Sequence, residues 1–309
     1  MIRRKIICGV CVGLMIALTG CNLGSGTTII KVPEKVTTTA EKETDKPSDD
    51  KPKDEKNVTI NNADDIKDFK SHDKSKVEKV VIADGVTEIP RNTFWNCIHV
   101  TSITIADSVT TIGDTAFCGC SLLPAIVIPE GVTAIEKETF RGCVTLSDIT
   151  IPGSVKSIGD KAFFGCYAIT TLELPSGVET LGVQAYGNCT GLTTVVLPDT
   201  LTTIGKQAFS SCAALTSVTM PDSVTTIETG AFESCKALTS IKISAGVTTI
   251  VEKSFYLCNN LTEVTIPSSV TTIEDGAFMD CDKLTTIYGT AGSYAETYAN
   301  ENGYTFVAQ

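Results

Sequence analysis

Histidine is scarce in this 309-residue chain, which has only His72 and His99. Neither recurs in the repeats described below, and no nucleophile or orienting partner recurs beside them. Side-chain catalysis needs titratable groups that converge on one place. The chain also lacks a glycine-rich phosphate loop and the HExxH and GxSxG patterns of hydrolases. We therefore expect no enzyme, no metal site and no cofactor, with calcium binding by scattered turn aspartates as an alternative.

An excess of positive charge is also lacking. The chain has 36 acidic and 25 basic residues, for a net charge of −11. Removal of residues 1–20, which hold three basic and no acidic residues, would move the net charge to −14. Nucleic acid and anionic lipid are repelled by such a surface. We therefore expect neither to be a partner.

The N-terminal residues MIRRKIICGVCVGLMIALTG place three basic residues before an apolar run from Ile6 to Leu18. This pattern predicts a secretory signal peptide over residues 1–20. The apolar run is shorter than a transmembrane helix requires. The sequence from Leu18 to Cys21, LTGC, resembles the lipobox of bacterial lipoproteins. The resemblance implies that Cys21 is lipidated and, with at least two acyl chains, anchors the exported protein stably to a membrane. A cleaved signal followed by a chance cysteine is the alternative.

Residues 21–56 differ in composition from the rest of the chain. From Gly24 to Lys56 they contain no aromatic residue and are rich in Thr, Lys, Glu, Asp and Pro. Such a segment cannot bury enough apolar surface to offset its ordering entropy, which predicts a disordered tether. As a flexible coil it would hold the folded part about 30 Å from its anchor.

Cysteine, by contrast, is plentiful and regularly spaced. Nine of the 13 cysteines recur with a constant step of 23 residues. An aromatic residue stands three positions before each of them, and apolar aliphatic residues stand three, six and eight positions after it, except that Gly289 takes the last of these positions. Because no insertion interrupts the array, every repeat must follow the same backbone path. The nine cysteines are Cys97, Cys120, Cys143, Cys166, Cys189, Cys212, Cys235, Cys258 and Cys281.

Each repeat reads C-x-x-L-x-x-I-x-I-P-x-x-V-T-x-I-x-x-x-A-F-x-x. The segment L-x-x-I-x-I predicts a short strand, which proline ends in six repeats. The V-T-x-I segment predicts a second extended piece, and A-F-x-x-C predicts a tight turn or a single helical turn. One repeat buries too little apolar surface to offset the entropy lost when its residues become ordered, so a single repeat cannot fold alone and repeats must stack. We predict a β-rich solenoid of about nine to ten coils that form a curved, right-handed superhelix.

The 23-residue unit, its VTxI, AF and C signatures and the final GSYAETYANENGYTF together resemble the BspA-like leucine-rich-repeat family of bacterial surface proteins. The resemblance covers residues from about 77 to 309. It implies a curved solenoid that is often exposed on the cell surface and, in some members, linked to adhesion or host-protein binding. It implies no catalytic residues.

The solenoid is expected over residues 77–287, between a cap at residues 57–76 and a cap at residues 288–309. The sequence of the first cap predicts a strand followed by a short helix with Ile66 and Phe69 on one side. In the second, Ser293 and Glu296 have the spacing of a capping box that would begin another helix. Both caps would close the open ends of the core.

The regular cysteines are expected to be structural. Equivalent positions of stacked coils lie about 4.7–4.9 Å apart with side chains pointing the same way. A disulfide needs Cβ atoms about 3.5–4.5 Å apart and turned toward each other, and zinc needs four converging thiolates. We therefore predict a buried ladder of small apolar residues. Cys118 stands in a variable column beside it and is predicted to be a free, reactive thiol.

Positions five and seven residues after each cysteine are expected to point outward. They form a hydroxyl-rich face of low charge that spans nine strands, about 40 Å. Solenoids use such faces for binding, although threonine is also simply a good exposed strand residue. A second, variable column adds exposed aromatic residues that could anchor a partner. The candidate ligand-binding residues are Ser102, Thr104, Thr150, Thr171, Glu173, Thr194, Ser217, Thr219, Ser240, Lys242, Trp95, Phe164 and Tyr256.

Together these patterns predict an exported, membrane-anchored lipoprotein that faces outward. Its solenoid would act as a non-enzymatic binding or adhesion module, monomeric, for an extracellular protein or glycan. A structural spacer of the cell envelope without a specific ligand is the rival hypothesis, because exposed threonines need no ligand to explain them. An enzyme with a site hidden in the caps is a more distant one.

Overall fold

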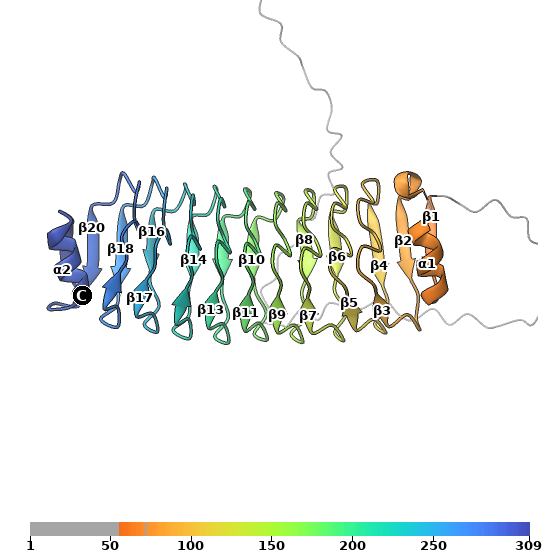
Figure 1. Ribbon diagram of the computed structural model, residues 1–309, viewed down its shortest axis with the longest axis horizontal. Helices are drawn as coiled ribbons and strands as arrows, with labels where there is room; N and C mark the ends of the chain where they lie inside the picture. The colour runs from red at the N-terminus through yellow and green to blue at the C-terminus, as the bar shows by residue number, and fades with distance from the viewer. Residues whose placement is uncertain (1–55, 72) are drawn as a thin grey trace, which may run out of the picture. The chain divides into compact units, whose positions relative to one another are not determined.

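The computed structural model describes residues 56–71 and 73–309. In these residues the chain forms a parallel β-solenoid of about 11 turns with a spacing of about 23 residues. The coils follow one another through the array, from β1 and α1 to β20 and α2 (Figure 1). The predicted solenoid is therefore confirmed. The number of coils exceeds the prediction, because strands in both predicted caps join the sheet.

The L-x-x-I-x-I segments form one column of strands, which we name the long-strand column. Each strand is parallel to the next wherever two are paired, and the register is 23 residues through the array, as in Thr171↔Thr194↔Ser217. β1 pairs with β2, and β21 pairs with β20. The strands are β1 (Asn57–Ile60), β2 (Lys79–Ile82), β4 (Ser102–Ile105), β6 (Ala125–Val127), β8 (Asp148–Thr150), β10 (Thr171–Glu173), β12 (Thr194–Val196), β14 (Ser217–Thr219), β16 (Ser240–Lys242), β18 (Glu263–Ile266), β20 (Thr286–Gly289) and β21 (Thr305–Ala308).

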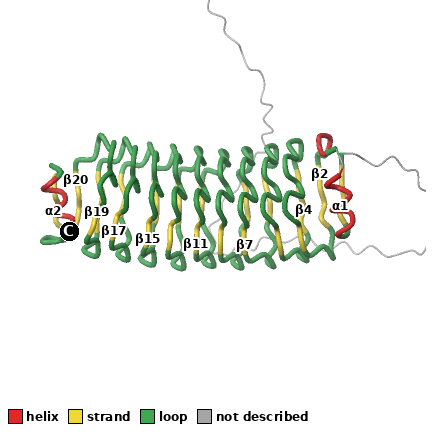
Figure 2. The backbone as a smooth tube through the Cα atoms, in the orientation of Figure 1, coloured by secondary structure: helices red, strands yellow, loops and turns green. Residues whose placement is uncertain are grey.

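The V-T-x-I segments form a second column of two-residue strands. Its central five strands, β7 to β15, make one continuous parallel sheet. Turns and loops connect the two columns and make up most of each coil (Figure 2). The short strands are β3 (Glu88–Ile89), β5 (Thr111–Ile112), β7 (Ala134–Ile135), β9 (Ser157–Ile158), β11 (Thr180–Leu181), β13 (Thr203–Ile204), β15 (Thr226–Ile227), β17 (Thr249–Ile250) and β19 (Thr272–Ile273).

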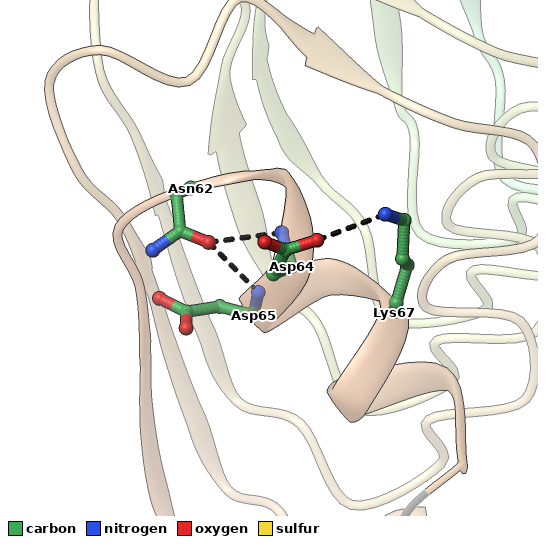
Figure 3. A network of polar contacts seen from close by, with 4 residues as sticks. All are labelled: Asn62, Asp64, Asp65 and Lys67. Atoms are coloured by element: carbon green, nitrogen blue, oxygen red, sulfur yellow. Dashed lines mark hydrogen bonds and ion pairs between the residues drawn. The ribbon is translucent and has the colours of Figure 1, made fainter.

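Helix α1 (Ala63–Ser71) covers the first end of the core with Ile66 and Phe69, and the 3-10 turn η1 (Lys74–Lys76) follows it. Its start is fixed by local polar contacts (Figure 3). The Asn62 side-chain oxygen accepts hydrogen bonds from the N–H groups of Asp64 and Asp65, at 2.9 and 3.1 Å. Lys67 pairs with Asp64 at 2.8 Å on the exposed side. The Asn62 cap thereby satisfies two N–H groups at the start of α1 that have no partner within the helix.

Helix α2 (Tyr294–Glu301) lies at the opposite end, ahead of β21 (Figure 1). The capping box expected there is not formed, so that prediction was wrong: Glu296 accepts from the residue before the N-cap, and the Ser293 N–H donates to the Thr290 carbonyl instead. The Glu296 carboxylate accepts the N–H of Gly292 at 2.7 Å. The Ser293 hydroxyl makes no capping bond and is buried without a partner in the described chain. None of the described helices is long and apolar enough to cross a membrane.

The A-F-x-x-C segment forms the third corner of each coil, as tight turns rather than a helix. The residues five and one before each cysteine have positive φ, for example Asn92 at 60° and Asn96 at 55°. The aromatic rings stack coil upon coil, with centroids 4.9 to 5.9 Å apart. Phe69 of α1 and Tyr298 of α2 end this column in tilted contacts at 5.0 and 6.2 Å. We name this column the aromatic corner.

Hydrogen bonds join the aromatic corner at each step from Phe94 to Phe278. The N–H of each aromatic residue donates to the next coil, as from Phe140 to the Ala162 carbonyl at 2.8 Å. The cysteine thiols add a second bond. From Cys120 onward, each donates to the carbonyl of the aromatic residue 26 positions earlier, at 3.1 to 3.3 Å. The ladder cysteines are all buried, and they act as donors as well as small apolar residues.

The long-strand column, unlike the aromatic corner, is interrupted. It divides into four hydrogen-bonded sheets, with breaks between β4 and β6, β8 and β10, and β14 and β16. Pro124 explains the first break. Its equivalents Thr193 and Thr216 donate their N–H to the preceding coil at 2.8 and 2.9 Å, whereas proline has no N–H. The aliphatic side chains beside the breaks become partly exposed: Ile105, Ile149, Ile151, Val218 and Met220.

Candidate functional site

The outward positions of the long-strand column make up the candidate site, which we name the strand face. Alternation along each strand places the aliphatic residues inside and their neighbours outside. Thr194 is half-buried, and the other predicted residues are exposed: Ser102, Thr104, Thr150, Thr171, Glu173, Ser217, Thr219, Ser240 and Lys242. The structure therefore brings these residues into one column, which the three breaks divide.

The hydroxyls of the strand face differ from hydroxyls elsewhere on the coils. Four residues after the cysteine, hydroxyls bond to the preceding coil, as from Thr193 to the Thr170 carbonyl at 2.8 Å. Eleven residues after it they do so again, as from Ser154 to the Val132 carbonyl at 2.7 Å. Within the described chain, the predicted strand-face hydroxyls make no such bond. They are therefore available to a ligand without loss of an internal bond.

The three candidate aromatic residues do not form one cluster. Trp95 and Phe164 are 69 residues apart, which is three coils, and Tyr256 lies four coils further. Trp95 is exposed, whereas Phe164 and Tyr256 are half-buried. The Phe164 ring lies against Gly187, whose added Cβ would come within 3.0 Å of it, and the Arg141 guanidinium lies 6.0 Å from its centroid. The Phe164 ring therefore packs against Gly187 and Arg141 of its own chain.

A groove lies along one end of the strands β10, β12 and β14. Its volume is about 680 Å³. The proline that follows each strand and the last outward residue of each strand are among its lining residues. Sequence reasoning missed this groove, although the repeated proline was a visible signal for a row of rigid apolar rings. It is lined by Ile151, Glu173, Leu174, Pro175, Ser176, Val196, Leu197, Pro198, Asp199, Thr200, Thr219 and Pro221.

Reactive groups do not converge near the strand face. No group of three or more His, Cys, Asp or Glu side chains in the described residues could hold a metal ion. Burial raises the pKa of the ladder thiols from Cys97 to Cys235, to about 11 for Cys97 and about 12 for Cys143 and Cys189. Burial also raises the pKa of the half-buried Cys118 thiol. A smaller fraction of this thiol is therefore ionised at neutral pH than in a solvated cysteine. His72 and Cys21 lie outside the described residues.

The repeat, the solenoid and the buried corner together match a known family. Residues 64–193 and 181–302 match the family described as BspA type leucine rich repeat region. The chain belongs to this family. The matched residues cover the described solenoid from α1 to α2, so the resemblance noted in the sequence is confirmed. The search of curated proteins found no match.

Similar solved structures also contain leucine-rich repeats. A leucine-rich repeat protein from Bacteroides ovatus is 25% identical, with a TM-score of 0.53 over 76% of this chain and 78% of that chain. A leucine rich cell surface protein from Faecalibacterium prausnitzii is 28% identical, with a TM-score of 0.41 over 73% and 76% of the two chains. A leucine-rich repeat protein from T. pallidum is 23% identical, with a TM-score of 0.46 over 74% and 85%.

Proposed function

We propose that this BspA-type protein is a non-enzymatic binding module that is displayed on the cell surface and takes a protein or glycan ligand on its strand face. The main support is the difference between its hydroxyls. The hydroxyls of Thr193 and Ser154, four and eleven residues after a cysteine, are bonded to the preceding coil, whereas the predicted strand-face hydroxyls make no hydrogen bond within the described chain and, apart from the half-buried Thr194, are exposed. An extended, rigid face with free polar groups is the kind of surface that solenoid proteins use for binding.

The ligand hypothesis can be tested with three charged substitutions, Thr171→Lys, Thr194→Lys and Ser217→Lys. Purified protein is presented to extracellular matrix proteins and to a glycan array. Saturable binding should fall by at least about tenfold in the variants, because lysine both obstructs the face and removes hydroxyl partners. Thr226→Lys is the matched control, since Thr226 is an exposed strand hydroxyl of the other column. Absence of any ligand would favour the spacer hypothesis instead.

We further propose that lipid on Cys21 anchors the module and that residues 21–56 act as its tether. The support is the LTGC sequence directly after the apolar run and the polar composition that follows it. Cys21→Ser should move the protein from the membrane fraction to the soluble fraction, and metabolic labelling with a fatty acid should be lost. Continued fatty-acid labelling of the Cys21→Ser variant, or its retention in the membrane fraction, would contradict the anchor.

A further inference from the structure

The groove beside β10, β12 and β14 has a boundary at each end. The long-strand column breaks between β8 and β10, and again between β14 and β16, so this three-stranded sheet is separate from its neighbours. Ile151 lines the groove from beyond the first break, and Thr219 and Pro221 line it at the second. The groove therefore belongs to one short stretch of the array rather than to every coil.

Much of the lining of the groove is apolar. The buried Leu174 and Leu197 line it together with the row of Pro175, Pro198 and Pro221. Neighbouring parallel strands are about 4.8 Å apart, so the outer two prolines of this row are separated by about 10 Å. An extended segment rises about 3.3 Å per residue, and three to five residues would therefore cover the row.

The charges in the groove are of one sign. Glu173 and Asp199 are the charged residues among its lining, and both are exposed. The whole chain also has a net charge of −11, which attracts cations over a longer range. No aromatic side chain lines the groove, so it lacks the flat ring on which a sugar would stack.

We propose that this groove binds an extended, positively charged segment of a protein ligand. Aliphatic or proline side chains of that segment would lie on Pro175, Pro198 and Pro221, and its Lys or Arg side chains would pair with Glu173 and Asp199. The inference rests on the proposed binding role and specifies the ligand class at one place on that surface. A rigid row of proline rings suits such a segment, because little side-chain entropy is lost on contact.

The proposal can be tested with the intact chain and fluorescent pentapeptides. RPIPR combines positive charge with apolar side chains, EPIPE reverses the charge, and RGSGR keeps the charge without the apolar side chains. Anisotropy titration should show saturable binding of RPIPR alone, and its affinity should weaken as salt is raised from about 20 to 300 mM. Equal binding of EPIPE, binding of RGSGR as tight as that of RPIPR, or no saturable binding of RPIPR would overturn the proposal.

Two variants assign the binding to this groove. Glu173→Gln with Asp199→Asn should weaken RPIPR binding about two- to tenfold, as loss of two exposed ion pairs would. Pro198→Ser should weaken it without loss of folding, because another coil has Ser244 at the equivalent position. Glu263→Gln with Asp275→Asn removes the same charge elsewhere and should change affinity less than twofold. Equal weakening in this control would overturn the assignment.

The test also separates this inference from the proposed function. A protein ligand whose binding is lost on Thr171→Lys but unchanged by the groove variants would refute the groove and leave the binding module intact. Binding of neutral glycans with no peptide binding would likewise refute the groove. Loss of ligand binding in both sets of variants would support both proposals, because Thr171 and Glu173 lie on the same strand.

Discussion

The aromatic corner and the long-strand column are made by the same repeats but hold the coils together differently. At the break between β8 and β10, Phe140 still donates its N–H to the Ala162 carbonyl at 2.8 Å. Cys166 also donates its thiol to the Phe140 carbonyl at 3.2 Å. At the break between β14 and β16, Phe209 and Cys235 make the equivalent bonds at 2.9 and 3.3 Å. The corner is therefore continuous where the strands are not.

This difference indicates where the array can vary. The corner needs a ring, a thiol and two left-handed backbone positions in each coil, so its residues change little from one repeat to the next. The long-strand column can lose hydrogen bonds at three places while the corner keeps the coils aligned. Variation in the strands can therefore create local features, such as the groove, without loss of the fold.

The largest expected effect comes from ionising the corner. The ordinary thiol pKa is 9.0, and burial raises that of Cys143 and Cys189 to about 12. The unfolded chain therefore loses these protons first, so the stabilisation is complete below pH 9 and is lost between pH 9 and about 12. Each such thiol should lower the free energy of unfolding by about 1.4 kcal/mol per pH unit in this range.

Denaturant unfolding at a series of pH values measures this loss. Cys143→Ala with Cys189→Ala should reduce the alkaline slope by about 2.8 kcal/mol per pH unit, at some cost to stability at pH 7. Cys118→Ala is the control and should change the slope much less, because Cys118 is only half-buried. An unchanged slope in the double variant would show that the ladder thiols are not protected by burial.

The next effect concerns ring stacking at a break. Phe140→Ala should lower the free energy of unfolding by about 3–5 kcal/mol, because it removes a fully buried ring between Phe117 and Phe163. Thr150→Ala, on the exposed face of the same coil, should change it by less than about 0.5 kcal/mol. Urea unfolding followed by circular dichroism compares the two. Similar losses would mean that the strand face also supports the fold.

Tyr186 offers a stabilising change within the corner. Its ring is fully buried in the stack, and its hydroxyl has no hydrogen-bond partner in the described chain. Tyr186→Phe should therefore raise the free energy of unfolding by about 1–3 kcal/mol, since an unpaired polar group leaves the core. Tyr167→Phe, at an exposed ring, is the control with little expected change. A lower thermal midpoint for Tyr186→Phe would contradict this account.

The smallest expected effect lies in the corner backbone. Leu257 has a φ of 60°, which costs a leucine more than an asparagine. Leu257→Asn should raise stability by about 0.5–1 kcal/mol, and the reciprocal Asn96→Leu, at φ 55°, should lower it by a similar amount. Thermal unfolding of the pair measures both. Shifts in the same direction would show that side-chain packing, and not φ, decides these positions.

Much of the fold could be predicted from the sequence, because its constraints repeat. The constant step of 23 residues fixes the register, and the strand pattern fixes which side chains face inward. The β8–β10 and β14–β16 breaks could not be predicted, because Thr170 and Thr239 have the same residue type as the bonded Thr193. The β4–β6 break could have been predicted, since Pro124 replaces the hydroxyl residue that stands four positions after the cysteine in the other repeats. The strand β21 was missed because its spacing from β20 departs from 23 residues.

The candidate site was less predictable than the fold. Alternation along the strands correctly indicated which residues face outward, but not which hydroxyls are bonded to other coils. That distinction depends on distances between coils, as between Thr193 and the Thr170 carbonyl. Trp95, Phe164 and Tyr256 looked equivalent in sequence, yet only Trp95 is exposed. Their burial depends on neighbours such as Gly187, which lie a full coil away.

Residue-resolved hydrogen exchange tests most directly whether the corner is continuous while the strands are interrupted. Among the described residues, the N–H groups of Thr170 and Thr239 donate to no backbone carbonyl, whereas those of Thr193 and Thr262 donate at 2.8 Å. We predict rapid exchange at Thr170 and Thr239, and slow exchange at Thr193, Thr262 and the corner amide of Phe140. Equal protection of all four threonines, or faster exchange at Phe140 than at Thr170, would contradict the account.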